Sequence, residues 1–222
     1  MTELNNNEEV VEVRSLPRIG SPAPSFTAKT THGEIKLEDY KGQWLILFSH
    51  PADFTPVCTT EFIGFQNMYP QLREMNTELL GLSIDSVHSH IAWVRNIEEK
   101  FGVKIEFPVI ADLSMDVAHK FGMIMPDESD TETSRAVFIM DPEQTVRAII
   151  YYPSAIGRDM NEIFRLLTAL QTADEHSIAT PANWQEGDRV IVPPAPTQEL
   201  AAERMDNPEY ECKDFYFCTK QL

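Results

Sequence analysis

Strand-like and helix-like segments alternate from about residue 18 to about residue 172, and this order constrains the fold more than any other feature. A short, wholly apolar run at residues 44–48 is typical of a buried central strand. Apolar side chains then recur at helical spacing across residues 61–75. Strands that alternate with helices predict an α/β fold in which helices flank a central sheet.

The remaining pattern completes this prediction. Further strands are expected at 79–84, 107–111, 136–140 and 146–152, and further helices at 88–101, 160–173 and 197–205.

We divide the chain into an acidic N-terminal tail at 1–17, a main α/β domain at 18–175 and a C-terminal extension at 176–222. The valines at residues 10–13 suit an edge strand or a packing contact with a partner. Residues 190–196 are extended, but their prolines exclude a central strand. The extension is expected to pack on the main domain or on a second subunit, because it is too small to bury a core of its own.

Charge and composition exclude several classes of partner. The 222 residues carry a formal net charge of −17. Such a charge repels phosphate backbones and anionic membrane surfaces, so neither nucleic acid nor membrane is an expected partner. No segment approaches the roughly 20 apolar residues of a membrane-spanning helix. The acidic N-terminus does not resemble a signal peptide, so we expect a cytoplasmic location.

The chain contains three cysteines, Cys58, Cys212 and Cys218. So small and odd a number does not suggest a structural disulfide framework. A metal site is weakly supported, because there is no C-x-x-C pair and no histidine lies near the two C-terminal cysteines in sequence. We therefore expect no metal or other cofactor. Inert core thiols and redox chemistry remain as alternatives.

Cys58 lies at the expected start of a helix. Thr55 is a favoured N-cap residue and Pro56 a favoured first helical residue, which puts Cys58 in the first turn. There the helix dipole and the free backbone N–H groups favour a thiolate, the nucleophilic form of cysteine. Thr55 and Cys58 are three residues apart, so both side chains can address one small substrate. The alternative is a buried small apolar residue. Arg135 is the candidate for a nearby cation, although it could instead neutralise the acidic run at 127–132.

The segment Pro51-Ala-Asp-Phe-Thr-Pro-Val-Cys58 matches P-x-x-x-T-x-x-C, the active-site motif of peroxiredoxins, the alkyl hydroperoxide reductase and thiol-specific antioxidant family. The longer string from Phe48 to Glu61 resembles the one-cysteine-type subgroup. Further segments resemble the family in the same order along the chain, at residues 20–26, 82–86, 107–112, 135–139 and 180–184.

This resemblance implies a thioredoxin-like fold, in which helices flank a central mixed sheet, and a thiol peroxidase that needs neither metal nor flavin. Cys58 would attack the terminal peroxide oxygen and become a sulfenic acid. Thr55 would hydrogen-bond the peroxide, and Arg135 would stabilise the thiolate and the developing charge. Pro51 would shield the pocket. Two further residues match supporting positions of the family, namely Arg158, a second arginine, and His50, for which a purely structural role is the alternative.

The C-terminal Cys-x5-Cys resembles archaeal and some bacterial members of this subgroup. In those members the second tail cysteine of another subunit resolves the sulfenic acid, which favours Cys218 over Cys212. A Cys212–Cys218 disulfide is an alternative form, and two buried thiols in an aromatic tail are the structural alternative. The resemblance also implies a thioredoxin-like or small-thiol reductant and a homodimer, often assembled into a pentamer of dimers, that is, a decamer.

One departure and two competing functions complete the prediction. Residues 42–46 lack the G-x-S-x-G of mammalian one-cysteine members, so phospholipase activity is not carried over. A holdase chaperone or redox sensor on the same fold is the second hypothesis. A binding module with an inert Cys58 is the third. A thioredoxin-type reductase is disfavoured, because Glu61 occupies the place of the second cysteine of a C-x-x-C.

Overall fold

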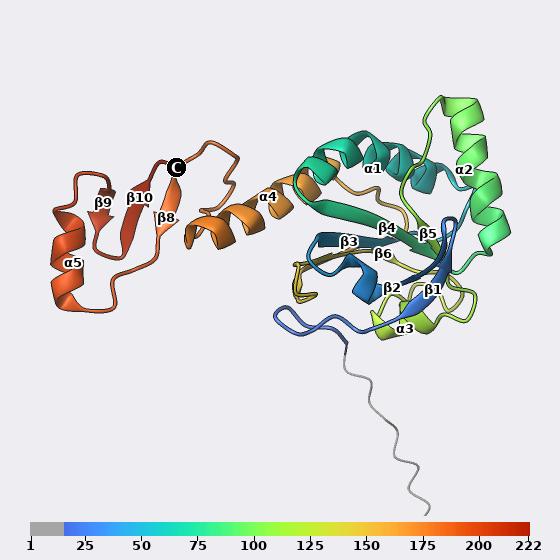
Figure 1. Cartoon of the computed structure of the whole chain (residues 1–222), viewed down its shortest axis with the longest axis horizontal. Coiled ribbons are helices and arrows are strands. Elements are labelled where there is room, and N and C mark those ends of the chain that lie inside the picture. Colours follow the sequence, from blue (N-terminus) through green and yellow to red (C-terminus); the bar gives the residue numbers. More distant parts are fainter. Residues whose placement is uncertain (1–15) are drawn as a thin grey trace, which may run out of the picture. The chain divides into compact units, whose positions relative to one another are not determined.

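The computed structural model describes residues 16–222, which form two compact units (Figure 1). The first unit ends at Gly157 and the second comprises Arg158–Leu222. The predicted valine strand at residues 10–13 lies outside the described residues. The predicted domain boundary at residue 175 lies after the helix Met160–His176, whereas the boundary between the two compact units lies before it. The predicted division into domains stays a prediction.

The first unit contains a seven-stranded sheet with the order β2-β1-β5-β4-β3-β6-β7. Its strands are β1 (Thr27–Thr30), β2 (Gly33–Lys36), β3 (Trp44–Ser49), β4 (Thr77–Ser83), β5 (Val109–Ala111), β6 (Arg135–Met140) and β7 (Val146–Tyr152). Strands β3, β4 and β5 run parallel, whereas β3 pairs antiparallel with β6. The sheet is therefore mixed, as predicted, with the buried strand β3 near its centre.

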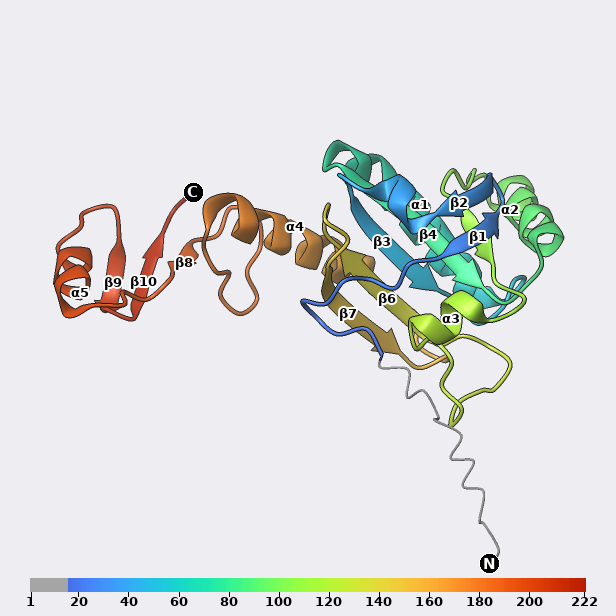
Figure 2. The same cartoon turned by 60° about the horizontal axis from the view of Figure 1, so that its bottom comes forward.

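Helices flank this sheet on both faces (Figures 1 and 2). They are α1 (Pro56–Glu74), α2 (Val87–Phe101) and the short α3 (Asp116–Lys120), with a 3-10 turn η1 (Leu37–Tyr40). Successive side chains of a strand point to opposite faces. Accordingly, Phe48 stacks on Phe65 of α1 with ring centroids 3.9 Å apart, whereas Leu47 packs in the core cluster that contains Phe121, at the end of α3. Strand β3 thus supports the helix that carries Cys58.

The second unit begins with helix α4 (Met160–His176) and ends in a three-stranded sheet of order β8-β10-β9. The other elements are β8 (Val190–Val192), α5 (Gln198–Met205), β9 (Glu211–Asp214) and β10 (Phe217–Lys220). Trp184 is buried in a small core with Ala169, Ile178 and Val190. This cluster shows that the C-terminal segment, together with α4, does bury apolar side chains of its own.

Most of the elements predicted from periodicity are present, several with shifted ends. Strand β8 lies at the edge of its sheet, in keeping with the prolines that follow it. The sequence analysis did not find the β1–β2 hairpin, α3, or the β9–β10 hairpin. The β9 segment Glu-Cys-Lys-Asp is polar and half-exposed to exposed, so it lacks the apolar alternation on which the predictions rested.

Candidate active site

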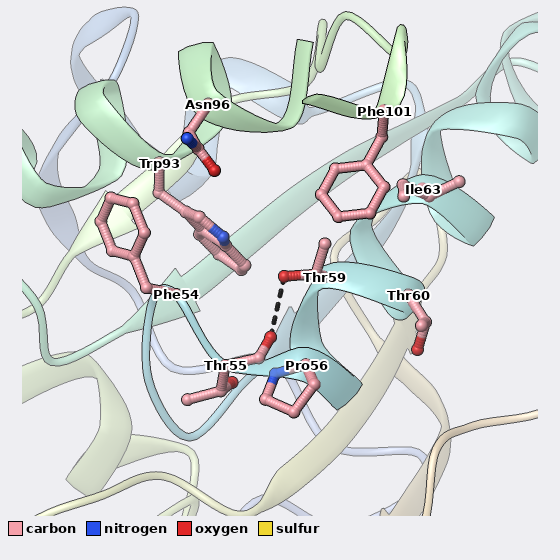
Figure 3. Close-up of a pocket in the computed structure, with 9 residues that line it drawn as sticks. All are labelled: Phe54, Thr55, Pro56, Thr59, Thr60, Ile63, Trp93, Asn96 and Phe101. Atoms are coloured by element: carbon pink, nitrogen blue, oxygen red, sulfur yellow. Dashed lines mark hydrogen bonds between the residues drawn. The ribbon is translucent and has the colours of Figure 1, made fainter. Parts of the chain in front are cut away.

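Helix α1 begins as the sequence predicts. Thr55 is the N-cap in extended conformation, Pro56 is the first helical residue, and Cys58 is the third. The Thr55 hydroxyl does not cap the helix; it donates to the carbonyl oxygen of Ala52 at 2.9 Å. Thr59 closes the turn by donating from Oγ1 to the Thr55 carbonyl at 2.8 Å (Figure 3). The loop before α1 is therefore held to the helix by hydroxyl groups on both sides of Pro56.

Cys58 is a fully buried free thiol with a cation beside it. The Arg135 Nη1 atom donates to Cys58 Sγ at 3.3 Å and to Glu61 Oε2 at 2.7 Å. The Arg135 Nε atom donates to the carbonyl oxygen of Ser154 at 2.8 Å, which fixes the plane of the guanidinium. Arg135 is only 3% exposed, so it is not a surface residue that neutralises the acidic run. A positive charge next to a sulfur in the first turn of a helix favours the thiolate.

Glu61 was missed as a site residue by the sequence analysis. It is buried one helical turn after Cys58 and forms an ion pair with Arg135. The sequence does offer one indication of this role, because an acidic residue three positions after Cys58 lies on the same face of the helix.

Pro51 and Arg158 are both buried. Pro51 belongs to the loop between β3 and α1, whereas Arg158 is the first residue of the second unit. Their roles at Cys58 remain predictions.

His50 belongs to a buried hydrogen-bonded network that also contains Asp53 and His90. His50 Nε2 lies 3.0 Å from Asp53 Oδ1, and His90 Nδ1 lies 2.8 Å from Asp53 Oδ2. His90 Nε2 lies 3.0 Å from the carbonyl oxygen of Ile110, and the Asp53 amide donates to Asp85 at 3.0 Å. The three side chains are close enough to bind a metal ion, but the hydrogen bonds account for their spacing, and we assign no metal. The sequence analysis found His50 and missed its two partners.

Burial and hydrogen bonding shift the pKa values of His50 and Asp53. Burial lowers the pKa of His50, although its hydrogen bond to Asp53 acts in the opposite direction. Burial alone would raise the pKa of Asp53, but the hydrogen bonds from His50 and His90 outweigh it and hold that pKa below its ordinary value. His50 is thus favoured as a neutral ring and Asp53 as a carboxylate. The Nδ1 atom of His50 is buried and has no hydrogen-bond partner among residues 16–222.

A cavity of about 410 Å³ lies against the first turns of α1, on the side that faces α2 (Figure 3). Its walls are mainly apolar and include Phe54, Ile63, Trp93 and Phe101. Phe54 has a positive φ of 57°, unusual for a bulky residue, and is exposed, whereas the preceding Asp53 is buried. Trp93 forms a wall of the cavity and also packs on His50, with ring centroids 5.1 Å apart.

The two tail cysteines face each other across the β9–β10 hairpin. Cys212 and Cys218 are partners in the strand register and are joined by a disulfide, with their Cα atoms 4.0 Å apart. Cys218 is fully buried and Cys212 is half-buried. The structure therefore contains the alternative disulfide form that the sequence analysis named.

Comparison with known families supports the same interpretation. The AhpC/TSA family matches residues 19–149, and the C-terminal domain of 1-Cys peroxiredoxin matches residues 169–207. A protein of Aquifex aeolicus named peroxiredoxin is 53% identical over 96% of this chain and all of its own length. A peroxiredoxin of Methanosarcina mazei is 56% identical over 93% of this chain and 98% of its own.

Solved structures show the same fold. A yeast mitochondrial 1-Cys peroxiredoxin has a TM-score of 0.82 and 37% identity, covering 93% of this chain and all of its own. A cysteine-to-serine mutant of peroxiredoxin 6 of Arenicola marina has a TM-score of 0.83 and 36% identity, covering 92% of this chain and 98% of its own. The predicted thioredoxin-like fold is confirmed. The family match over residues 19–149 and the relatives at 53% and 56% identity show that the chain is a member of the peroxiredoxin family of thiol-dependent peroxidases.

Proposed function

We propose that Cys58 is the peroxidatic cysteine, which reduces hydrogen peroxide and organic hydroperoxides to water and alcohols. The observation that carries this proposal is the 3.3 Å contact between the Arg135 guanidinium and the Cys58 sulfur. In the reaction the Cys58 sulfur bonds to the terminal peroxide oxygen, the O–O bond breaks, and the departing oxygen takes up a proton. The products are a Cys58 sulfenic acid and water or an alcohol.

The neighbouring groups suit this displacement. Arg135 stabilises the thiolate and then the charge that develops on the oxygens. Thr55 positions the peroxide through its hydroxyl, which the contact with Ala52 already orients. Pro51 shields the pocket in this proposal, and Arg158 and His50 keep the supporting roles that the family resemblance implies.

We further propose that a C-terminal cysteine of another subunit resolves the sulfenic acid. After the thiol reductant has opened the Cys212–Cys218 disulfide, the free Cys218 thiol attacks the Cys58 sulfenic sulfur, a new disulfide forms, and water leaves; Cys212 is the alternative. The Cys212–Cys218 disulfide supports a redox role for this pair, because it shows that the hairpin brings the two sulfurs into bonding distance. A thioredoxin-like protein or a small thiol then restores the thiols by exchange.

The proposal includes assembly as a homodimer, because the implied resolving cysteine comes from a second copy. A pentamer of dimers is the further assembly that the family resemblance implies. Neither nucleic acid nor a membrane has a part in it. No helix within residues 16–222 is long and apolar enough to cross a bilayer. A cytoplasmic location remains a prediction from the sequence.

Hydrogen peroxide consumption with dithiothreitol as reductant tests the proposal. Wild type is compared with Cys58→Ser, Cys212→Ser and Cys218→Ser, with non-reducing gels alongside. We expect Cys58→Ser to be inactive and Cys218→Ser to lose the disulfide-linked dimer.

If Cys58→Ser consumes peroxide as fast as wild type, the peroxidase proposal is wrong. If only Cys58 matters and no variant forms a linked dimer, the chemistry is of the one-cysteine kind. Slow turnover with every reductant, together with protection of unfolding proteins, would favour the holdase or sensor instead.

A further inference from the structure

The two sulfurs of the tail disulfide differ in their access to solvent. Cys218 is 0% exposed, whereas Cys212 is half-buried on a strand where the neighbouring residues Glu211 and Lys213 are exposed. In thiol–disulfide exchange a thiolate bonds to one sulfur while the other sulfur departs, and access helps to decide which sulfur is attacked. An external thiol can therefore reach Cys212, and Cys218 is then the sulfur that departs.

The hairpin that carries the pair is also held together by contacts other than the disulfide. Arg189 donates from Nε to the Thr219 hydroxyl and from Nη2 to the Thr219 carbonyl oxygen, both at 3.0 Å. Thr219 Oγ1 donates to the Glu211 carbonyl oxygen at 3.3 Å, and Arg189 Nε lies 3.5 Å from the Glu211 carboxylate. We therefore expect β9 and β10 to stay in register when the disulfide opens, with Cys212 still opposite Cys218.

Each sulfur has a backbone acceptor close by for its reduced state. Cys218 Sγ lies 3.5 Å from the Asp214 carbonyl oxygen, and Cys212 Sγ lies 3.8 Å from the Arg204 carbonyl oxygen. A thiol is a weak hydrogen-bond donor, so each of these oxygens can accept from it. The hairpin thus accommodates a dithiol as well as a disulfide, as a pair that cycles between the two states requires.

We propose that Cys212 is a catalytic cysteine that relays electrons from the thiol reductant to Cys58. The inference rests on the proposed function, in which peroxide oxidises Cys58 and Cys218 resolves it. The Cys58–Cys218 disulfide then holds its Cys218 sulfur opposite the Cys212 thiol of the same tail. Attack by this strand partner is intramolecular, so it is favoured over attack by a thiol from solution.

The cycle balances in three steps once the sulfenic acid has formed. In Cys58–SOH + Cys218–SH → Cys58–S–S–Cys218 + H₂O, a disulfide forms and water leaves. In Cys58–S–S–Cys218 + Cys212–SH → Cys212–S–S–Cys218 + Cys58–SH, the thiol proton passes to the departing Cys58 sulfur. In Cys212–S–S–Cys218 + 2 R–SH → Cys212–SH + Cys218–SH + R–S–S–R, the reductant bonds first to Cys212. The tail disulfide is thus an intermediate of every turnover.

Peptide mapping of the full-length Cys58→Ser protein, with its tail disulfide intact, tests where the reductant enters. The protein reacts briefly with glutathione as the probe, is quenched in acid, alkylated and digested with trypsin. Cleavage after Lys213 puts Cys212 and Cys218 on separate peptides. We expect about tenfold or more glutathione on Cys212 than on Cys218. Equal labelling of the two cysteines, or labelling mainly of Cys218, would overturn the inference.

Non-reducing gels of reduced protein, sampled over time after one equivalent of peroxide, test the relay step. Wild type should pass through the linked dimer and end as a monomer with the tail disulfide. Cys212→Ser lacks the relaying thiol, so its linked dimer should accumulate to about tenfold or more above the final wild-type level. Lys213→Ser changes an exposed neighbour and should behave as wild type. Equal amounts of linked dimer in wild type and Cys212→Ser would show that Cys212 does not relay.

These experiments separate the relay from the proposed function. The peptide map involves neither Cys58 nor peroxide, and it needs no tail substitution that could disturb folding. Peroxide consumption by Cys58→Ser, or the absence of a linked dimer from every variant, would refute the proposed function or its resolution step. Labelling mainly of Cys218, with a linked dimer that Cys212→Ser does not increase, would refute the relay alone.

Discussion

Arg135 and Glu61 form a buried ion pair, and the same guanidinium nitrogen that contacts Glu61 also donates to the Cys58 sulfur. Arg135 therefore contributes both to the stability of the fold, through Glu61, and to the reactivity of Cys58. Substitutions can separate these two effects. Arg135→Met leaves the Glu61 carboxylate buried without this guanidinium. We expect a loss of about 3–5 kcal/mol in the free energy of unfolding. We also expect the rate constant for Cys58 oxidation to fall by about a hundredfold or more.

The double variant Arg135→Met/Glu61→Gln is the control for this prediction. It removes the buried charge as well, so most of the stability should return in urea unfolding, while the oxidation rate should remain low. If the double variant recovers both stability and rate, Arg135 acts only through the fold.

Thr55 contributes through its hydroxyl rather than its shape. Thr55→Val keeps the β-branched side chain but removes the donor that contacts Ala52 at 2.9 Å. We expect at least about a tenfold lower rate of Cys58 oxidation, since a partly buried hydrogen bond is lost where the peroxide has to be positioned. Thr55→Ser retains the hydroxyl and should stay close to wild type. Equal rates in the two variants would contradict a role for the hydroxyl. Stopped-flow tryptophan fluorescence at equal peroxide concentrations gives both values.

We expect the Cys212–Cys218 disulfide to stabilise the second unit. It closes a short loop, with a sequence separation of 6, for which chain entropy predicts about 2 kcal/mol. We expect Cys212→Ser, or reduction of wild type, to lower the stability of this unit by that amount. Trp184 lies in the core of this unit, so its fluorescence in a background of Trp44→Phe and Trp93→Phe reports the unit selectively. The background protein without the cysteine change is the control. Identical unfolding curves before and after reduction would show that the disulfide does not stabilise this core.

Asp53 should contribute to stability in a pH-dependent way. Despite burial, hydrogen bonds from His50 and His90 hold its pKa below the ordinary value, whereas an aspartate in the unfolded chain titrates near about 3.9. Its contribution is therefore present above about pH 4 and is lost as the pH falls further, toward the folded-state pKa. Asp53→Asn should be less stable than wild type at neutral pH, and the difference should narrow below about pH 4. Urea unfolding at a series of pH values measures this, with the exposed Asp127→Asn as control. A difference that does not change with pH would contradict the prediction.

The centre of the fold and the core of the site could be predicted because local patterns specify them. The run at 44–48 is apolar at every position, and the helix after it begins with a threonine at the N-cap position and a proline. Short-range rules therefore predict β3, α1 and the place of Cys58. Arg135 was a candidate only, because nothing local shows that a strand brings it to the sulfur. The contact joins residues 77 positions apart.

The parts that were missed depend on tertiary contacts. Asp53 and His90 are 37 residues apart in sequence and meet only when α2 packs beside the loop before α1. The β9–β10 hairpin is polar, so its strands are identified by their pairing and by the disulfide between them rather than by periodicity. Helix α4 was correctly identified as a helix, but periodicity does not reveal which unit a helix belongs to.

Cys58 and Cys218 are each fully buried in their own unit. Two sulfurs in that state cannot meet by collision of folded surfaces. A disulfide between them therefore requires that the first turn of α1, or the tail hairpin, or both, open first. The frequency of that opening then sets an upper limit on the rate of resolution, whatever the number of subunits nearby. If Cys218 resolves Cys58, the local stability of the segment that opens, whether the first turn of α1 or the tail hairpin, determines how long the sulfenic acid persists.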